Sequence, residues 1–140
     1  MSLCVVDSSF AMAWVFEDER NDLADALLAR LGDGDSILVP AVLWALEVRN
    51  CLRNGVLRRR LSKQMAELRR RELLALPRVT VTCPNGLADE LHELMTGHNL
   101  TSYDACYISV AREHGLPLAT LDKQLARAAT AVGVPRFTGT

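Results

Sequence analysis

Short apolar runs alternate with longer amphipathic segments along this chain, and this alternation constrains the fold more than any other feature of the sequence. The short runs are candidate strands at 3–6, 37–39, 79–81, 118–120 and 136–138. Segments with helical periodicity lie between them, at about 8–16, 21–31, 42–54, 61–75, 86–96, 102–114 and 122–131. Strands that alternate with helices indicate βαβ units, and the sequence therefore predicts an α/β fold with a mostly parallel sheet.

Glycine and proline separate these segments. Five glycines stand at or just past expected helix ends, namely Gly32, Gly55, Gly97, Gly115 and Gly133, as C-terminal caps should. Segment 42–75 is predicted to be a helical hairpin, broken at Asn54-Gly55 and standing off the sheet. Such a hairpin could serve as a dimerisation arm, although packing against its own domain is the simpler interpretation.

The length of 140 residues and a hydrophobic fraction of 49% indicate one domain, 1–140, with a packed core. No apolar run approaches the roughly 18 residues that a membrane helix needs. The first seven residues lack the basic start and long apolar stretch of a secretion signal. We therefore expect a cytoplasmic protein with no membrane partner. The four scattered cysteines are interpreted as free thiols rather than as zinc ligands or disulfides.

The charges are distributed unevenly. Residues 1–35 contain eight acids and two bases, whereas residues 49–71 contain nine Arg or Lys and a single acid, Glu67. Six arginines of the second segment are candidates for contact with RNA: Arg58, Arg59, Arg60, Arg69, Arg70 and Arg71. A planar guanidinium suits phosphate better than an ammonium group does. A solvated helical face with ordinary salt bridges is the simpler explanation of a basic run taken by itself.

Four acidic residues stand at informative places. Asp7 ends the first apolar run, Glu47 lies inside a helical segment, Asp104 begins another, and Asp122 follows Leu118-Ala119-Thr120. Taken singly, Asp7 and Asp122 are good N-caps, and Asp104 suits the first turn of a helix. Glu47 is different, because its neighbours are apolar and a buried carboxylate needs a partner such as a cation.

The predicted sheet brings some of these acids together. Ligands of an open parallel sheet bind beyond the carboxyl ends of its strands, and both Asp7 and Asp122 directly follow predicted strands. Carboxylates gathered at that edge would repel one another unless a divalent cation neutralised them. Hard oxygen ligands indicate Mg²⁺ or Mn²⁺. Such an ion activates water for phosphodiester cleavage and stabilises the leaving oxygen.

Four segments of the chain resemble, in the same order, the signature motifs of PIN-domain ribonucleases. They are Val5-Val6-Asp7-Ser8-Ser9, Glu47-Val48-Arg49-Asn50, Thr101-Ser102-Tyr103-Asp104-Ala105 and Ala119-Thr120-Leu121-Asp122-Lys123-Gln124-Leu125. The resemblance covers essentially the whole chain. Within the family, the chain is most similar to VapC toxins, the small PIN proteins of toxin–antitoxin pairs.

This resemblance implies a parallel sheet in the order 3-2-1-4-5 and a Mg²⁺- or Mn²⁺-dependent endoribonuclease. The metal would be held by the residues that match the family's acids: Asp7, Glu47, Asp104 and Asp122. Ser9 and Asn50 match positions that support the metal or orient its waters. The density of arginine at 58–60 and 69–71 departs from the family's pattern and is attributed to substrate or partner preference.

The implied partners are an RNA substrate, a second copy of the chain in a homodimer, and a cognate VapB-type antitoxin that inserts a segment across the active-site groove. Several apolar side chains lie on the helices that flank this groove in the family: Phe10, Trp14, Phe16, Leu43 and Trp44. Packing in the core is the simpler explanation for most of the aromatic side chains among them.

Two phosphoryl-transfer proteins on similar folds are disfavoured. An aspartate-phosphorylating phosphatase needs Asp-x-Asp after the first strand, where this chain has Asp7-Ser8-Ser9. A receiver domain needs its acceptor Asp after the third strand, where this chain has Thr82-Cys83-Pro84. The alternative from another class is a non-catalytic module that binds RNA or protein. It would bind RNA with steep salt dependence and without metal, but it would have no use for a cluster of acids.

Overall fold

A four-stranded parallel sheet forms the centre of the molecule in the computed structural model, which describes residues 1–139. The strands are β1 (Ser2–Val6), β2 (Ser36–Pro40), β3 (Arg78–Val81) and β4 (Leu118–Ala119). Their order is β3-β2-β1-β4, and every neighbouring pair is parallel. The predicted α/β class and the predicted order of the first four strands are therefore confirmed.

The predicted fifth strand at 136–138 is reduced to one bridge, in which Arg136 pairs in parallel with Leu118. The N–H of Leu118 donates to the Pro135 carbonyl, and the N–H of Phe137 donates to the Leu118 carbonyl, both at 2.9 Å. Because β4 itself is only two residues long, it offers too little backbone for a longer ladder. The segment nevertheless lies beside β4, where the fifth strand was expected.

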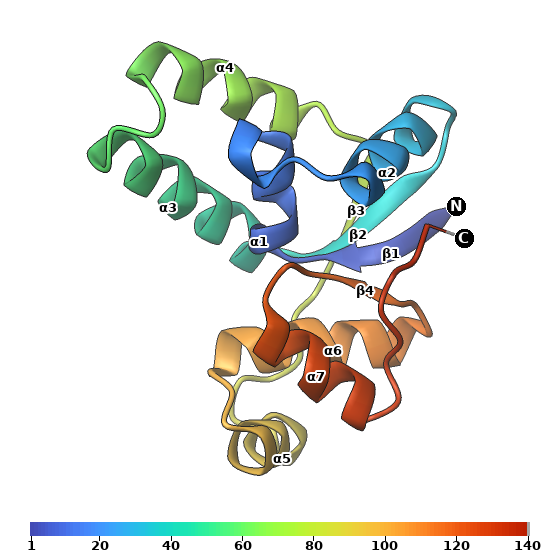
Figure 1. Cartoon of the computed structure of the whole chain (residues 1–140). Helices are drawn as coiled ribbons and strands as arrows, with labels where there is room; N and C mark the ends of the chain where they lie inside the picture. The colour runs from blue at the N-terminus through green and yellow to red at the C-terminus, as the bar shows by residue number, and fades with distance from the viewer. Residues whose placement is uncertain (140) are drawn as a thin grey trace.

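Helices cover both faces of the sheet. The described residues form α1 (Ser8–Ala11), α2 (Asp22–Gly32), α3 (Leu43–Leu57), α4 (Lys63–Leu74), α5 (Asp89–His98), α6 (Ser102–His114) and α7 (Lys123–Ala131). The predicted helix at 8–16 is a shorter α1 followed by the 3-10 turns Met12–Trp14 and Glu17–Glu19. Figure 1 shows α1 to α4 on one side of the sheet and α5, α6 and α7 on the other.

The core is continuous across these layers. The middle residues of β1 and β2 are buried, as expected of parallel strands covered on both faces. Helix α6 packs on β1, β2 and β4, and its residues from Ala105 to Ala111 are all buried. Phe10, Phe16 and Trp44 belong to this core, whereas Trp14 and Leu43 are partly buried against it. No helix within residues 1–139 is long and apolar enough to cross a membrane.

The predicted hairpin is formed by α3 and α4, which lie side by side in Figure 1. The predicted break at Asn54-Gly55 is wrong, because α3 continues through Gly55 to Leu57. Gly55 is buried, and a Cβ there would lie 2.7 Å from Cζ of Phe16. The glycine therefore allows an aromatic ring to pack against the helix instead of ending it. The turn is made later, where Arg59 has a φ of 57°.

Helix α3 begins directly beyond β2. Val42 has φ 68° and ψ −54°, and the N–H of Leu43 donates to the Ala41 carbonyl at 2.8 Å. This is a three-residue γ-turn in a conformation that is rare and strained for a β-branched residue. The tight turn sets the start of α3 at the carboxyl end of β2, and it thereby brings Glu47 toward the edge where β1 and β4 also end.

Candidate active site

The first and fourth strands bring Asp7 and Asp122 to the same edge of the sheet. Val6 of β1 pairs with Ala119 of β4, and the N–H of Asp7 donates to the Ala119 carbonyl at 3.2 Å. Asp122 follows β4 by three residues and caps α7. This is the edge that the sequence predicted for both residues.

Asp7 is the most buried of the four acids, with 5% of its surface exposed. Its Oδ1 accepts hydrogen bonds from the Ser9 hydroxyl at 2.8 Å and from the N–H of Phe10 at 2.9 Å. Its Oδ2 accepts one from the Thr120 hydroxyl at 2.5 Å. Burial raises the pKa of Asp7 to about 6; the three hydrogen bonds act against this rise, and the charge of Glu47 adds to it.

Glu47 and Asp104 are half-buried and come from helices on opposite faces of the sheet. The hydroxyl of Tyr107 donates to Oε1 of Glu47 at 2.6 Å. Burial raises the pKa of Glu47, the Tyr107 hydrogen bond lowers it, and the charge of Asp104 raises it. Burial also raises the pKa of Asp104, and the charge of Asp122 adds to the rise. The N–H of Asp104 donates to the Thr101 hydroxyl, which caps α6.

The four acids therefore form a series of electrostatic neighbours, in the order Asp7, Glu47, Asp104 and Asp122. Their side chains do not converge on one point. Asp122 is exposed, and its Oδ1 accepts from the N–H groups of Gln124 and Leu125. Within residues 1–139, no three His, Cys, Asp or Glu side chains are arranged so that they could hold a metal ion as they stand.

The chemistry of this cluster suits a divalent cation. The charges that shift the pKa values of Asp7, Glu47 and Asp104 are all negative, and no Arg or Lys is among them. The polar atoms in contact with Asp7 and Glu47 are hydroxyl groups and one backbone N–H. Oxygen-rich ligand sets without thiolate or imidazole are those that Mg²⁺ and Mn²⁺ prefer. The chemistry of the residues present therefore fits such an ion, although the four carboxylates are not gathered around one point.

The hydroxyl of Ser9 links the first and fourth motifs. It donates to Asp7, lies 3.2 Å from the Thr120 hydroxyl, and accepts from the N–H of Leu121 at 3.0 Å. Asn50, the other expected supporting residue, is exposed on α3, and its side chain makes no hydrogen bond with the part of the chain that the structure describes. Its supporting role stays a prediction.

Two further residues of the site were not singled out from the sequence. Thr120, which is 3% exposed, donates to Asp7 and accepts from the N–H of Asp122. Tyr107 holds Glu47. Both lie in apolar elements and so resemble core residues, yet spacing offered a signal: Tyr107 is one helical turn after Asp104, and Thr120 is two residues before Asp122.

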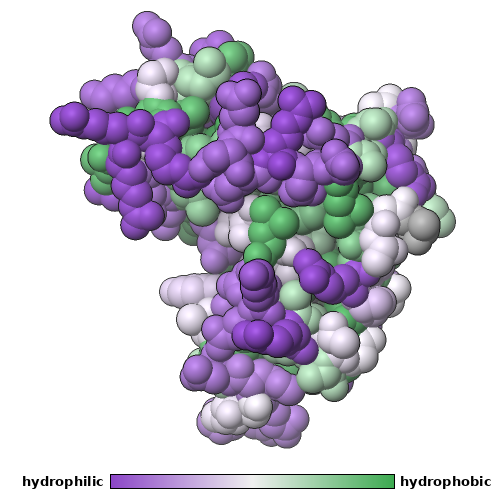
Figure 2. All heavy atoms as spheres, in the orientation of Figure 1, coloured by the Kyte–Doolittle hydropathy of each residue, from purple (hydrophilic) through white to green (hydrophobic). Residues whose placement is uncertain are grey.

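A cavity of about 260 Å³ extends from Ser9 along α3 to Arg58, and Cys51 and Gly55 also line it. Figure 2 shows the left outline of the molecule hollowed between the group α1 to α4 and the group α5 to α7. Of the six arginines proposed to contact RNA, Arg58 is the one exposed residue that lines this cavity without an ion pair in residues 1–139.

Most of the other arginines proposed to contact RNA form ion pairs with acidic side chains. Arg60 pairs with Asp18 and Glu19 at 3.0 and 2.8 Å, and its guanidinium lies 3.9 Å from the ring centroid of Phe16. Arg70 and Arg71 pair with Glu67, and Arg69 pairs with Glu72. These are ordinary salt bridges on a solvated face, whereas Arg59 is exposed and unpaired within the described residues.

Comparison with known proteins finds one matching family model and several similar solved structures. The model of the PIN domain matches residues 4–131. No curated protein matches the chain. Among solved structures, PAE2754 from Pyrobaculum aerophilum is similar with a TM-score of 0.69 and 22% identity, over 91% of this chain and 84% of that one.

Two other solved structures are also similar. A toxin-antitoxin complex from Klebsiella pneumoniae has a TM-score of 0.57 and 17% identity, over 98% of both chains. FitAcB from Neisseria gonorrhoeae has a TM-score of 0.58 and 15% identity, again over 98% of both chains. At these identities the likeness concerns the fold.

Proposed function

Because the chain belongs to the PIN domain family, we propose that it is a Mg²⁺- or Mn²⁺-dependent endoribonuclease, a VapC-type toxin that cleaves cellular RNA in the cytoplasm. The observation that carries this proposal is the series of four acids, Asp7 and Asp122 at one edge of the sheet and Glu47 and Asp104 as their electrostatic neighbours. The pKa values of Asp7, Glu47 and Asp104 are raised, and no cation of residues 1–139 is among the charges that shift them. Nuclease activity is general in this family, and the ion and the substrate are the proposed part.

Each of the four acids has a part in this proposal: Asp7, Glu47, Asp104 and Asp122 would hold the metal. When bound, the ion supplies an activated water and stabilises charge at the scissile phosphate. The other residues prepare the site. Ser9 and Thr120 fix the orientation of the Asp7 carboxylate, and Tyr107 fixes that of Glu47. Arg58, on the cavity that starts at Ser9, is suited to attract the RNA backbone.

The proposal includes two protein partners. One is a cognate VapB-type antitoxin that covers the cavity beside Ser9 and so excludes RNA. The other is a second copy of the chain in a homodimer. The similarity in fold to one member of a toxin-antitoxin complex supports the first partner. Exposed apolar side chains at the start of α3, Val42 and Leu46, support a protein contact there.

The alternative is a module of the PIN fold that binds RNA or protein without catalysis. Two observations favour it. The carboxylate of Asp122 is occupied in capping α7, and the acids are not arranged to hold an ion without movement. Such a module would retain RNA on its exposed arginines and would not need metal.

Cleavage of total cellular RNA by the purified chain tests the proposal. We expect discrete fragments with Mn²⁺ or Mg²⁺ and intact RNA with EDTA. The double variant Asp7→Asn, Asp104→Asn should lose cleavage by at least about a thousandfold, because it removes two ligands. Asp33→Asn, at an exposed position away from the site, is the matched control and should cleave normally.

Two results would contradict the proposal. Cleavage by the purified chain that survives EDTA, or that the double variant retains, would mean that a metal held by these acids is not needed for the reaction. Intact RNA with every metal, from a chain that is folded by circular dichroism and free of antitoxin, would favour the binding module. Filter binding of RNA in EDTA would then measure that activity directly.

A further inference from the structure

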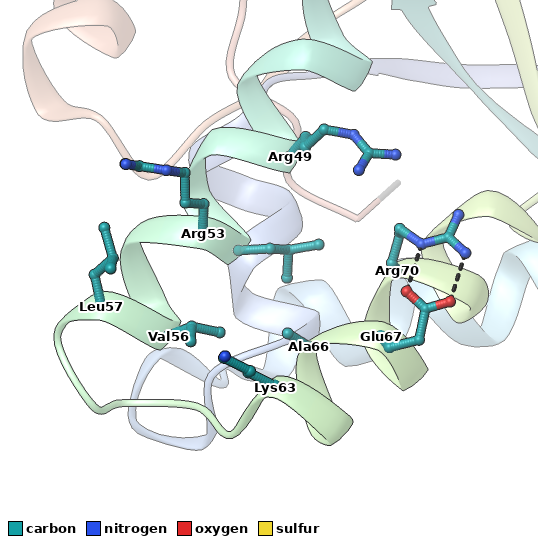
Figure 3. A pocket seen from close by; sticks show the side chains of 9 residues that line it. Arg49, Arg53, Val56, Leu57, Lys63, Ala66, Glu67 and Arg70 are labelled. Carbon is teal, nitrogen blue, oxygen red and sulfur yellow. Dashed lines mark hydrogen bonds and ion pairs between the residues drawn. The ribbon is translucent and has the colours of Figure 1, made fainter.

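A second hollow lies between α3 and α4. An open cavity of about 300 Å³ is lined by the later part of α3 and the first turns of α4 (Figure 3). A smaller cavity of about 110 Å³ lies toward Trp44 and the end of α4. Both are lined by Arg49, Leu52 and Arg70, so they are neighbours, and we name the two together the outer groove.

The outer groove faces away from the acids. Val56, on its floor, is nine residues after Glu47, which places it about 180° around the helix from that residue. The opposite stripe of α3, with Cys51 and Gly55, lines the cavity beside Ser9. A ligand in the outer groove would therefore leave the acidic cluster uncovered, and this surface is separate from the proposed active site.

The floor of the outer groove is aliphatic. Leu52, Val56 and Ala66 form it in the larger cavity, and Val48 and Leu73 continue it in the smaller one. Two leucines flank the floor and are well exposed: Leu57 is 63% exposed and Leu74 is 59% exposed. Apolar surface of this kind favours aliphatic side chains of a partner.

The rim of the outer groove is cationic. Arg49, Arg53 and Lys63 are exposed, and none of them has an ion pair within residues 1–139. In Figure 3 the one bonded pair among the residues drawn joins Arg70 to Glu67, at 2.6 Å. Three unpaired cations beside an aliphatic floor would bind a ligand that carries negative charges on one side and apolar groups on the other.

We propose that the outer groove docks an acidic amphipathic segment of a partner protein, in which carboxylates face the rim and aliphatic side chains face the floor. The charge pattern argues against two other occupants. A symmetric contact between two copies would bring the same cations against each other, and a head-to-tail contact would not close. Single-stranded RNA binds best where its bases can stack on exposed aromatic rings. The aromatic ring that lines this groove, that of Trp44, is only 4% exposed, which disfavours RNA as the occupant.

A labelled model peptide tests this proposal on the whole chain. The probe is a helical peptide with Leu at positions i, i+3, i+4 and i+7 and Glu at most other positions, about as long as α3. A peptide of the same composition with scrambled order and a single-stranded RNA of similar charge are the comparison probes. Fluorescence anisotropy should give a dissociation constant in the micromolar range for the amphipathic peptide, at least about tenfold tighter than for the scrambled one.

Charge reversal then locates the site. The double variant Arg53→Glu, Lys63→Glu should weaken binding of the peptide at least about tenfold, because it replaces two rim cations by anions. Arg127→Glu, an exposed residue of α7 without an ion pair among the described residues, is the matched control and should bind normally. Urea unfolding of both variants checks that the fold is retained.

Several outcomes would overturn the proposal. Equal affinity for the ordered and scrambled peptides would mean that charge alone attracts them. RNA that binds more tightly than the peptide and is lost in the same double variant would make the groove an RNA surface. A dimer that becomes a monomer in the double variant would mean that a second copy occupies it. Binding does not depend on cleavage, so the result stands whether or not the chain cuts RNA.

Discussion

Asp7 has two roles that a sequence cannot separate. Its side chain caps α1 by accepting from the N–H of Phe10, as expected of an N-cap. The same carboxylate is held by Ser9 and Thr120 at the edge of the sheet. Capping of α1 and metal binding are therefore compatible roles for Asp7. The two roles are distinguished by how the charge of Asp7 affects stability at different pH values and in the presence of metal.

The raised pKa of Asp7 predicts an unusual dependence of stability on pH in metal-free protein. The folded-state pKa of Asp7, about 6, exceeds the usual value of 3.8. Between these two pH values, the folded state therefore holds a proton on Asp7 that the unfolded state has lost. The contribution of Asp7 to stability is therefore full below pH 3.8 and is lost as the pH rises through about 6. The difference amounts to roughly 3 kcal/mol.

Urea unfolding in EDTA at several pH values measures this effect. Asp7→Asn should keep the cap, lack this part of the pH dependence, and be more stable than the wild type at about pH 7. Mn²⁺ should stabilise the wild type at that pH and leave Asp7→Asn unchanged. The same pH dependence in both proteins would mean that Asp7 is not the group responsible.

Tyr107 is predicted to position Glu47. Tyr107→Phe keeps the ring in the core and removes the hydrogen bond to Oε1 of Glu47. The pKa of Glu47 should rise, and the affinity for Mn²⁺ should fall about tenfold, with a larger loss at low pH. Tyr103→Phe is the control, since Tyr103 is 60% exposed on the same helix. Equal losses for both variants, measured by calorimetric titration, would contradict the positioning role.

At the scale of elements, the sequence predicted helices and their connections better than it predicted helix ends. Asn54-Gly55 has the composition of a helix stop, yet α3 continues through it. What decided the outcome is a contact with Phe16, which lies far away in the sequence. The γ-turn at Val42 was not predicted either, because nothing in Pro40-Ala41-Val42-Leu43 is typical of such a turn. Local patterns cannot encode such contacts.

Gly55 gives a direct prediction for this scale. Alanine normally stabilises a helix by up to about 1 kcal/mol relative to glycine. Gly55→Ala should instead destabilise the protein by about 1 to 3 kcal/mol, because the new methyl would overlap the ring of Phe16. Gly97→Ala, inside α5 with no atom within 4 Å of the added Cβ, should stabilise it. Changes of opposite sign in the free energy of unfolding of the two variants, measured with urea, would support the packing argument. A Gly55→Ala variant more stable than the wild type would refute it.

At the scale of the molecule, the sequence predicted the edge of the sheet that holds the acids. Asp7 and Asp122 follow strands that are neighbours, and this could be inferred from the order of segments alone. The hydroxyl groups that hold the acids could not, because Thr120 and Tyr107 look like core residues until the strand and the helix are placed. The distances between the acids also depend on the packing of α3 and α6.

The proposed homodimer is a prediction for the whole molecule. Light scattering of the purified protein should give a mass near twice 15.4 kDa. Leu46→Glu should lower it to that of one chain, because Leu46 is an apolar residue of α3 that is 56% exposed. Leu87→Glu, at a position that is 94% exposed in a connection, tests another apolar site. A wild-type protein with the mass of one chain would rule the dimer out.

Calorimetric titration of Mn²⁺ into the metal-free chain, at about pH 7.5, tests the central claim most directly. The account predicts saturable binding to the wild type and to Asp33→Asn. It predicts no binding to the double variant Asp7→Asn, Asp104→Asn, whose fold is retained. Equal binding to wild type and double variant, or none to a folded wild type up to about 10 mM Mn²⁺, would contradict the claim that these acids form a metal site.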